Sequence, residues 1–237
     1  MSDLPSYVSG VFLATVAATF GFLYYGIKLA QRKKSNTHAI AVSTFMMVWL
    51  FLIAALSLND FFLAFEAMPP RFVFVLLPPM ISIFLILAIK RSRDFVRRMP
   101  ITTLTYLHIV RVPVEIVLWW LAIHQWVPKL LTFEGINYDI LSGVSAPFAA
   151  IFMVSLRSKS RIGAILWNCI TLALLVNIVG HALLAAPSPF QQFAFDQPNV
   201  AVFHFPFIWL PGFIVPAVLF AHLVSLMKLF DTETELV

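Results

Sequence analysis

Residues 102–127 have the sequence TTLTYLHIVRVPVEIVLWWLAIHQWV, in which apolar side chains predominate. A helix needs about 20 mostly apolar residues to cross the hydrocarbon core of a bilayer, and this stretch is long enough. The whole chain has the same character, with 61% hydrophobic residues, 11% charged residues and a mean hydropathy of +0.92. Soluble domains contain about 25% charged residues. The sequence therefore predicts an integral membrane protein and excludes soluble enzymes, nucleic-acid-binding domains and disordered chains.

Seven apolar segments of this kind follow one another along the chain. The segments between them are too short for a second globular domain, so we expect one all-α domain over residues 1–237, built as a seven-transmembrane-helix bundle. The N-terminal MSDLPSY lacks the basic region of a cleavable signal peptide, so the first span is expected to be retained. The predicted spans are 6–28, 39–58, 72–90, 102–127, 140–156, 162–186 and 200–229.

The basic residues predict the orientation of this bundle. With the N-terminus outside and the C-terminus in the cytoplasm, 13 of the 16 Lys and Arg residues fall in cytoplasmic segments, which agrees with the positive-inside rule. The outer loops then contain Arg71 and Lys129 and most of the acids, including Asp139. The short loops favour a bacterial inner (plasma) membrane. The cytoplasmic basic residues are Lys28, Arg32, Lys33, Lys34, Lys90, Arg91, Arg93, Arg97, Arg98, Arg157, Lys159, Arg161 and Lys228.

Charged side chains in the middle of the fourth span are the strongest candidates for a functional site. At 100° per residue, His108, Arg111 and Glu115 lie within about 60° of arc on one helix face. A charge at mid-bilayer costs about 2.5–3.5 kcal/mol on insertion scales, so this face is expected to point into the bundle. Two interpretations remain open: an Arg111–Glu115 ion pair that fixes helix packing, or a polar cavity or ion path near Pro113, which weakens the local backbone hydrogen bonding.

The histidines suggest a cofactor as a further possibility. His108 and His222 are expected at one depth on the cytoplasmic side, and His124, His181 and His204 at another on the outer side. Two such layers would suit a two-heme arrangement, and the outer three would suit a metal. Neither set has a specific spacing motif, so no cofactor is predicted. The single cysteine excludes an internal disulfide framework.

The last two spans contain further polar residues. Asn177 and His181 lie one turn apart on the sixth span and are candidates for the ligand or proton pathway. Asn168 and Thr171 lie on another face, where polar side chains commonly hold membrane helices together. Three prolines and a glycine in the last span predict a kinked or partly unwound helix.

Two outer segments, LTFEGINYDILSG (131–143) and AAPSPFQQFAFDQPNV (185–200), combine aromatic residues, acids, amides and turn formers. Solvated loops rarely hold so many phenylalanines. We therefore expect the second segment to form a lid over a cavity between the fourth, sixth and seventh spans. Its polar residues are Gln191, Gln192, Asp196 and Gln197.

These features favour a small transporter or ion-conducting protein, in which Glu115 would take up and release protons and His108 and His222 would relay them. A membrane redox protein that binds heme or a quinone-like substrate is an alternative, and a non-catalytic binding or scaffold protein is another. The ligand is expected to be a small molecule or ion. The bilayer itself is a partner, with anionic lipids at the basic segment 90–98. The sequence does not predict the oligomeric state.

Overall fold

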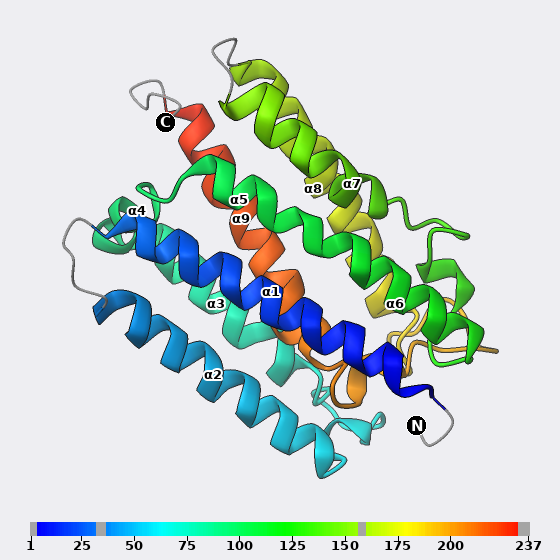
Figure 1. The fold of residues 1–237 in the computed structure, drawn as a ribbon. Coiled ribbons are helices and arrows are strands. Elements are labelled where there is room, and N and C mark those ends of the chain that lie inside the picture. Colours follow the sequence, from blue (N-terminus) through cyan, green and yellow to red (C-terminus); the bar gives the residue numbers. More distant parts are fainter. Residues whose placement is uncertain (1–3, 32–36, 156–159, 232–237) are drawn as a thin grey trace.

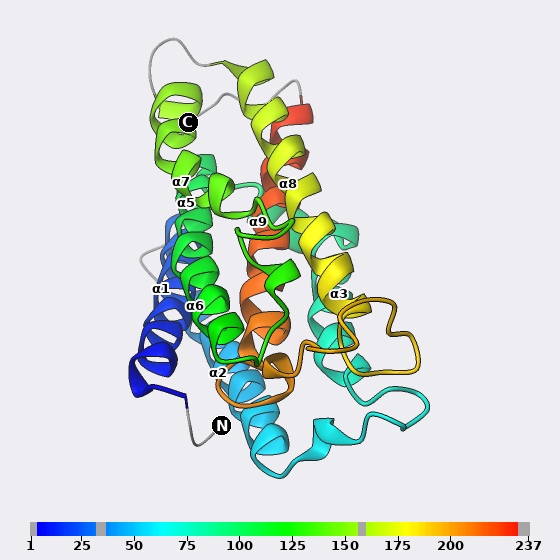
Figure 2. The ribbon, with the colours of Figure 1, turned by 90° about the vertical axis from the view of Figure 1, so that its right-hand side faces the viewer.

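The structure is a computed structural model that describes residues 4–31, 37–155 and 160–231 (Figure 1). Within these ranges the chain is helical and contains no strand. Figures 1 and 2 show an elongated bundle of roughly aligned helices. Five residues of the predicted basic pattern lie outside the described residues: Arg32, Lys33, Lys34, Arg157 and Lys159.

The described residues form nine α-helices, joined by short turns of other helix types. Four 3-10 turns occupy Phe61–Leu63, His108–Val110, Lys129–Leu131 and Ala201–Phe203, and π-helical segments occupy Ala149–Ser155 and Leu210–Ile214. The α-helices are α1 (Ser6–Ala30), α2 (Thr37–Leu58), α3 (Val73–Ala88), α4 (Lys90–Val96), α5 (Ile101–Leu107), α6 (Arg111–Ile123), α7 (Ile140–Phe148), α8 (Arg161–Leu184) and α9 (Val215–Phe230).

Five helices in the described part of the chain are long and apolar enough to cross a membrane, and a sixth candidate is the pair α3 and α4. That pair is bent by 93°, so α4 runs across the end of α3. The apolar helix at Ile140–Phe152 is shorter than the other candidates. The all-α membrane class is therefore supported with five to six candidate spans, whereas the predicted number of seven is not confirmed.

The last helix begins later than the sequence predicted. The predicted span 200–229 becomes the continuous helical stretch Leu210–Phe230, and His204 lies before it in extended backbone, with φ −108° and ψ 142°. Pro206 and Pro211 explain the shift, because proline lacks the backbone N–H that an α-helix requires. His204 and His222 therefore do not share one straight helix, which corrects the prediction.

The fourth span ends at Ile123, four residues before the predicted end. Gln125 adopts a left-handed conformation with φ 61°, and the Trp126 N–H donates back to the Leu121 carbonyl at 2.9 Å. This pattern closes the C-terminus of a helix and reverses the chain.

The reversal sends residues 126–139, here called the fold-back segment, back along the bundle, and Figure 2 shows this segment beside α6 and in front of α9. Thr132 and Asn137 in this segment are fully buried, and Asp139 is 5% exposed. The amide of Asn177 on α8 donates to the Ile136 carbonyl at 3.3 Å and holds the segment from the other side. Asp139, predicted to lie among the outer acids, is therefore inside the protein.

A glycine allows α7 to approach α6 closely at this point. A Cβ atom on Gly143 would lie 2.7 Å from the Val112 Cγ2 atom and 2.9 Å from the Val112 backbone nitrogen. Because real Cβ atoms do not come this close to backbone, glycine is required for the observed packing. The contact fixes the first turn of α7 and with it the position of Asp139.

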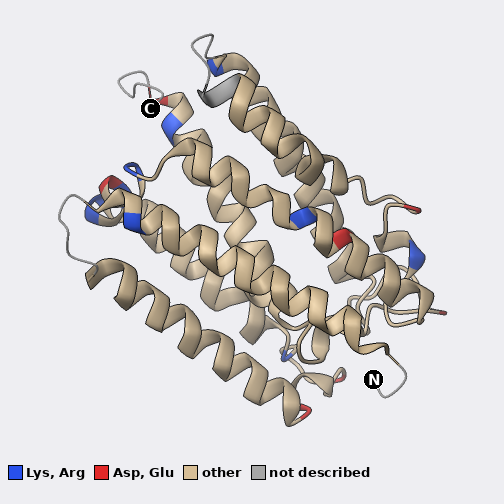
Figure 3. Cartoon of the chain, in the orientation of Figure 1, with Lys and Arg blue, Asp and Glu red and all other residues tan. Residues whose placement is uncertain are grey.

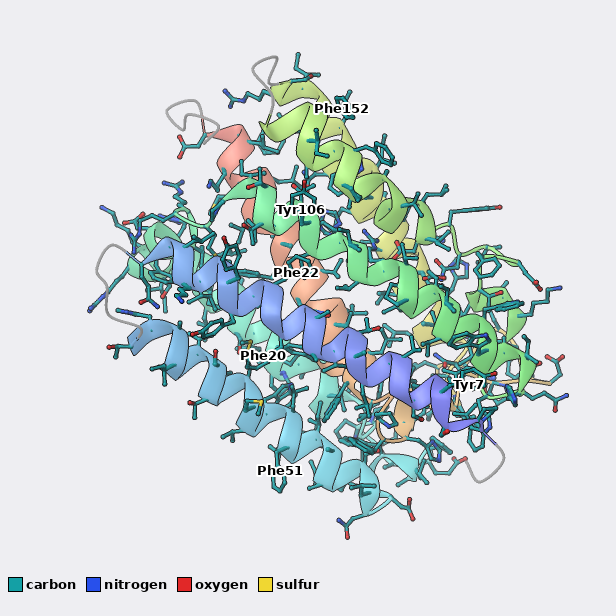
Figure 4. All side chains as sticks on the ribbon, viewed as in Figure 1. Tyr7, Phe20, Phe22, Phe51, Tyr106 and Phe152 are labelled. Carbon is teal, nitrogen blue, oxygen red and sulfur yellow. The ribbon has the colours of Figure 1, made fainter. Side chains whose placement is uncertain are left out.

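Large apolar side chains point outward along the bundle. Phe51 on α2 is 76% exposed and Phe152 is 58% exposed; both lie at the edge of the bundle in Figure 4. A bilayer would cover such side chains. Figure 3 shows that Lys and Arg gather at the end of the bundle formed by α4 and the C-terminal ends of α1 and α9.

Candidate functional site

Arg111, at the start of α6, is the centre of a buried polar cluster. Its side chain is 3% exposed. The guanidinium binds the Asp139 carboxylate through two nitrogens: Nε donates to Oδ2 at 2.6 Å, and Nη2 donates to Oδ1. Nη2 also donates to the Thr171 carbonyl on α8 at 3.0 Å, and Nη1 lies 3.2 Å from Nε2 of His222 on α9. Paired guanidinium–carboxylate contacts of this kind are strong and directional.

Glu115, one turn along α6, does not form the ion pair with Arg111 that one of the two open interpretations required. Its two carboxylate oxygens each lie 2.7 Å from the Asn137 amide nitrogen. The same nitrogen donates to the Leu131 carbonyl at 3.0 Å, and the Asn137 Oδ1 accepts from the Asp139 N–H. Asn137 therefore links the two carboxylates. The fold-back segment, with its own acid and amide, displaces the pairing that sequence proximity suggested.

The hydrogen bonds around His222 determine which ring nitrogen carries its proton. The Asn168 amide nitrogen donates to the Ala164 carbonyl at 3.0 Å, so the Asn168 Oδ1 faces His222 Nδ1, which is 3.0 Å away. Because that oxygen only accepts, Nδ1 carries the hydrogen and Nε2 is free to accept from Arg111. His222 is therefore a neutral imidazole in this arrangement.

His108 is fully buried beside His222, and their ring centroids are 4.0 Å apart. Trp167 on α8 contacts the His108 ring edge to face, with centroids 5.4 Å apart. Neither ring nitrogen of His108 has a hydrogen-bond partner among the described residues. A buried imidazole with two unpaired nitrogens is unusual, because buried polar atoms are nearly always hydrogen-bonded.

The cluster contains two carboxylates, one guanidinium and two imidazoles, all at most 5% exposed. With both acids ionised and both imidazoles neutral, it carries one net negative charge. Lys228 is the nearby cation on α9, and at 1.5 Å per residue it lies about 9 Å along the helix from His222. Its ammonium group donates to the Met99 carbonyl and not to a carboxylate of the cluster. One additional positive charge, from a proton or a bound cation, would neutralise the cluster.

The other predicted pathway residues lie apart from this centre. Asn177 contacts the backbone next to Asn137. His181 bonds its own helix through the Asn177 carbonyl at 2.8 Å and stacks on Phe193. Asn177 thus supports the fold-back segment, whereas His181 faces the outer loop.

The heme and metal alternatives do not fit the histidine geometry. The His108 and His222 rings are in direct contact, so a porphyrin cannot lie between them as it does between two axial ligands. His124, His181 and His204 each use Nδ1 for the carbonyl four residues earlier. Across the described residues, no three His, Cys, Asp or Glu side chains are grouped as a metal site.

The predicted outer lid is only partly attached to the bundle. Gln197 donates to the Val127 carbonyl at 2.6 Å and to the Ala122 carbonyl at 3.2 Å, while Gln191 bonds within its own loop. Gln192 and Asp196 are exposed. Phe193 stacks on His181 at the outer end of α8, whereas Phe190 and Phe195 are 56% and 72% exposed.

An exposed ion pair on the fold-back segment contrasts with the buried one. Lys129 Nζ lies 3.1 Å from a Glu134 oxygen, and Trp119 Nε1 donates to the other oxygen at 3.1 Å. These hydrogen bonds hold the pKa of Glu134 below its usual range. Both side chains of the pair are largely accessible, at 70% and 42%, so the contact is a surface feature.

Sequence reasoning missed Asn137, Asp139 and the role of Asn168. Asn137 and Asp139 were recognised as part of an unusual outer segment, and Asn168 was assigned to helix packing. The signal that could have found them is charge balance, since Arg111 and Glu115 both require buried partners. Chain distance gave no indication, because each of these three residues lies 22 to 54 residues along the sequence from the side chain that it contacts.

A family model described as a domain of unknown function (DUF8737) matches residues 68–230, which is more than half of the chain. The chain belongs to this family. Every residue of the buried cluster lies within the matched range, whereas α1 and α2 precede it. No curated protein and no solved structure matches the chain.

Proposed function

We propose that this DUF8737 protein is a small proton-coupled transporter, in which the cluster around Arg111 exchanges a proton for a cationic substrate. The observation that supports this proposal is the burial of five titratable side chains from four chain segments in an apolar bundle. Ionisable groups within membrane helices commonly mark proton relays and ion pathways.

The charge balance of the cluster favours exchange. Arg111 contacts Asp139 directly, while Glu115 is bound by an uncharged amide. An uncompensated charge is unfavourable in an apolar interior. Either a proton on Glu115 or a cation beside it would neutralise the carboxylate. Because only one of them is needed at a time, their alternation couples proton flux to cation flux.

His108 provides a route for the proton. Its two unpaired ring nitrogens can accept and donate in turn. Its ring contacts the ring of His222. The Arg111 guanidinium contacts both His222 and Asp139 and so links the two. The pair thus extends the cluster along α5 and α9, toward the end of the bundle where basic residues gather.

A structural role for the cluster is the second candidate. It is favoured by the four hydrogen bonds that Arg111 makes to Asp139, Thr171 and His222, a bonding pattern typical of a rigid polar core. In that case the ion pair holds the fold-back segment against α6, and no proton moves.

Glu115→Gln separates the two candidates. The purified protein is reconstituted into vesicles that contain a pH-sensitive dye, and proton release is followed after addition of Na⁺, K⁺ or ethylammonium. We expect Glu115→Gln to reduce the cation-dependent flux by about a hundredfold, the usual effect of removing a positioned proton-transfer group. The control Glu134→Gln removes an exposed carboxylate and should leave the flux unchanged. If Glu115→Gln folds normally and transports like the wild type, the cluster is structural.

We also propose that the N-terminus lies outside the cell and the C-terminus in the cytoplasm, across a bacterial inner membrane. The gathering of Lys and Arg at one end of the bundle supports this orientation. A reporter fused after Val237 should be active in the cytoplasm, and a tag at Ser2 should be accessible from outside. Accessibility of both ends from the same side would indicate an even number of spans and contradict the proposal.

A further inference from the structure

A large apolar cavity lies away from the polar cluster. It has a volume of about 950 Å³ and is lined by residues of α1, α2, α3, α4 and α9 together with Gly212 and Phe213. Pockets of about 300–1,000 Å³ are typical of bound small molecules. Its walls include Met46 and Trp49 on α2, Ile83 on α3, and Phe213 and Phe220 near and on α9.

Irregular helix geometry creates this cavity. Pro78 and Pro79 lie inside α3 and line it, and proline bends a helix because its ring clashes with the preceding turn. On the opposite wall, the π-helical segment Leu210–Ile214 widens the last span. Trp49 on α2 donates from Nε1 to the Gly212 carbonyl at 2.9 Å and so joins α2 to this segment.

One end of the cavity is cationic. Arg91 on α4 and Arg98, two residues after the end of α4, line this mouth together with the single acid Asp94. Arg98 is anchored by the carbonyls of Ala30 and Asp94. Neither arginine takes part in the ion pairs found in the described part of the chain. The mouth therefore retains positive charge that can face an anion.

The length of the cavity matches one leaflet of a bilayer. From His38 at the mouth to Trp49, α2 rises about 16 Å at 1.5 Å per residue. One leaflet provides about 15 Å of hydrocarbon, half of the 30 Å core. An acyl chain can therefore lie beside α2 while its headgroup remains at the level of α4.

We propose that this cavity binds an anionic phospholipid, with its phosphate at Arg91 and Arg98 and an acyl chain between α2, α3 and α9. The proposal is independent of proton exchange. The cavity lies on the Phe213–Phe220 side of α9, and His222 belongs to the cluster on its other side. A lipid in this position would fill the space that the helices leave open and join the loosely packed α2 to the bundle.

Quenching of Trp49 fluorescence by brominated lipids tests the proposal. The full-length protein is reconstituted into phosphatidylcholine vesicles with increasing fractions of brominated phosphatidylglycerol, and brominated phosphatidylcholine serves as the zwitterionic comparison. The Trp49 signal is the part of the fluorescence that disappears in Trp49→Phe. We expect phosphatidylglycerol to quench it at a several-fold lower fraction than phosphatidylcholine does.

Two variants and one matched control locate the binding site. Arg91→Gln should raise the half-quenching fraction about fivefold, the effect of one basic residue near an anionic surface. Ser82→Phe, which fills the cavity wall, should abolish the quenching. Arg93→Gln removes the same charge from α4 at a position outside the cavity lining and should have little effect. Equal quenching by the two lipids, equal effects of Arg91→Gln and Arg93→Gln, or full quenching in Ser82→Phe would each overturn the proposal.

Discussion

Replacing Asp139 by alanine is expected to destabilise the protein by about 3–5 kcal/mol, the usual effect of removing one partner from a buried ion pair. The substitution leaves the Arg111 guanidinium buried without a counter-charge, since Glu115 is held by Asn137 rather than by Arg111. It also removes the N-terminal anchor of α7. Thermal or denaturant unfolding in detergent, followed by circular dichroism, measures the loss.

A double-mutant cycle with Arg111→Met identifies the source of this effect. Each single variant leaves the other member of the pair buried without its partner, whereas the double variant removes both members. The double variant should therefore be more stable than the sum of the two separate losses predicts. The control Glu134→Gln breaks an exposed pair on the same segment and should change stability little. If the losses from Asp139→Ala and Arg111→Met simply add, the two groups do not interact and the described pairing is wrong.

The helical segments could be predicted from sequence because their signal is local. Runs of apolar residues predicted the helical membrane class, for which the described residues provide five to six candidate spans. The first helix, α1, begins at Ser6, where the prediction placed it. The ends were less predictable. The end of α6 depends on a left-handed Gln125, a residue type with no strong preference for that conformation, and the start of the last helix depends on which of three prolines interrupts it.

The site could be predicted in part. The helical period placed His108, Arg111 and Glu115 on one face, and depth along the bundle placed His222 at the level of His108; the two rings are in contact. The partner of Arg111 could not be predicted, because it depends on a segment that turns back into the bundle. Gly143 and Asn177 position that segment, and neither has a recognisable motif. Sequence proximity favoured Glu115, whereas the fold selects Asp139.

Asn137→Asp is expected to be the most damaging conservative substitution in the chain. Asn137 donates to both oxygens of Glu115 and to the Leu131 carbonyl. Aspartate has the same shape but no N–H group, so it removes these donors and places a second carboxylate against Glu115. We expect a loss of at least about 3 kcal/mol, measured by unfolding in detergent.

The loss should depend on pH in a defined direction. When the new carboxyl group takes up a proton, it can donate to Glu115 in place of the amide, as in carboxyl pairs that share one proton. The variant should therefore recover stability at about pH 5 relative to about pH 8, whereas the wild type should change less. The control Asn59→Asp removes an amide donor at an exposed position, where Asn59 bonds the Ala55 carbonyl, and should stay within about 0.5 kcal/mol of the wild type. Equal stability of Asn137→Asp and Asn59→Asp at both pH values would show that Asn137 does not hold Glu115.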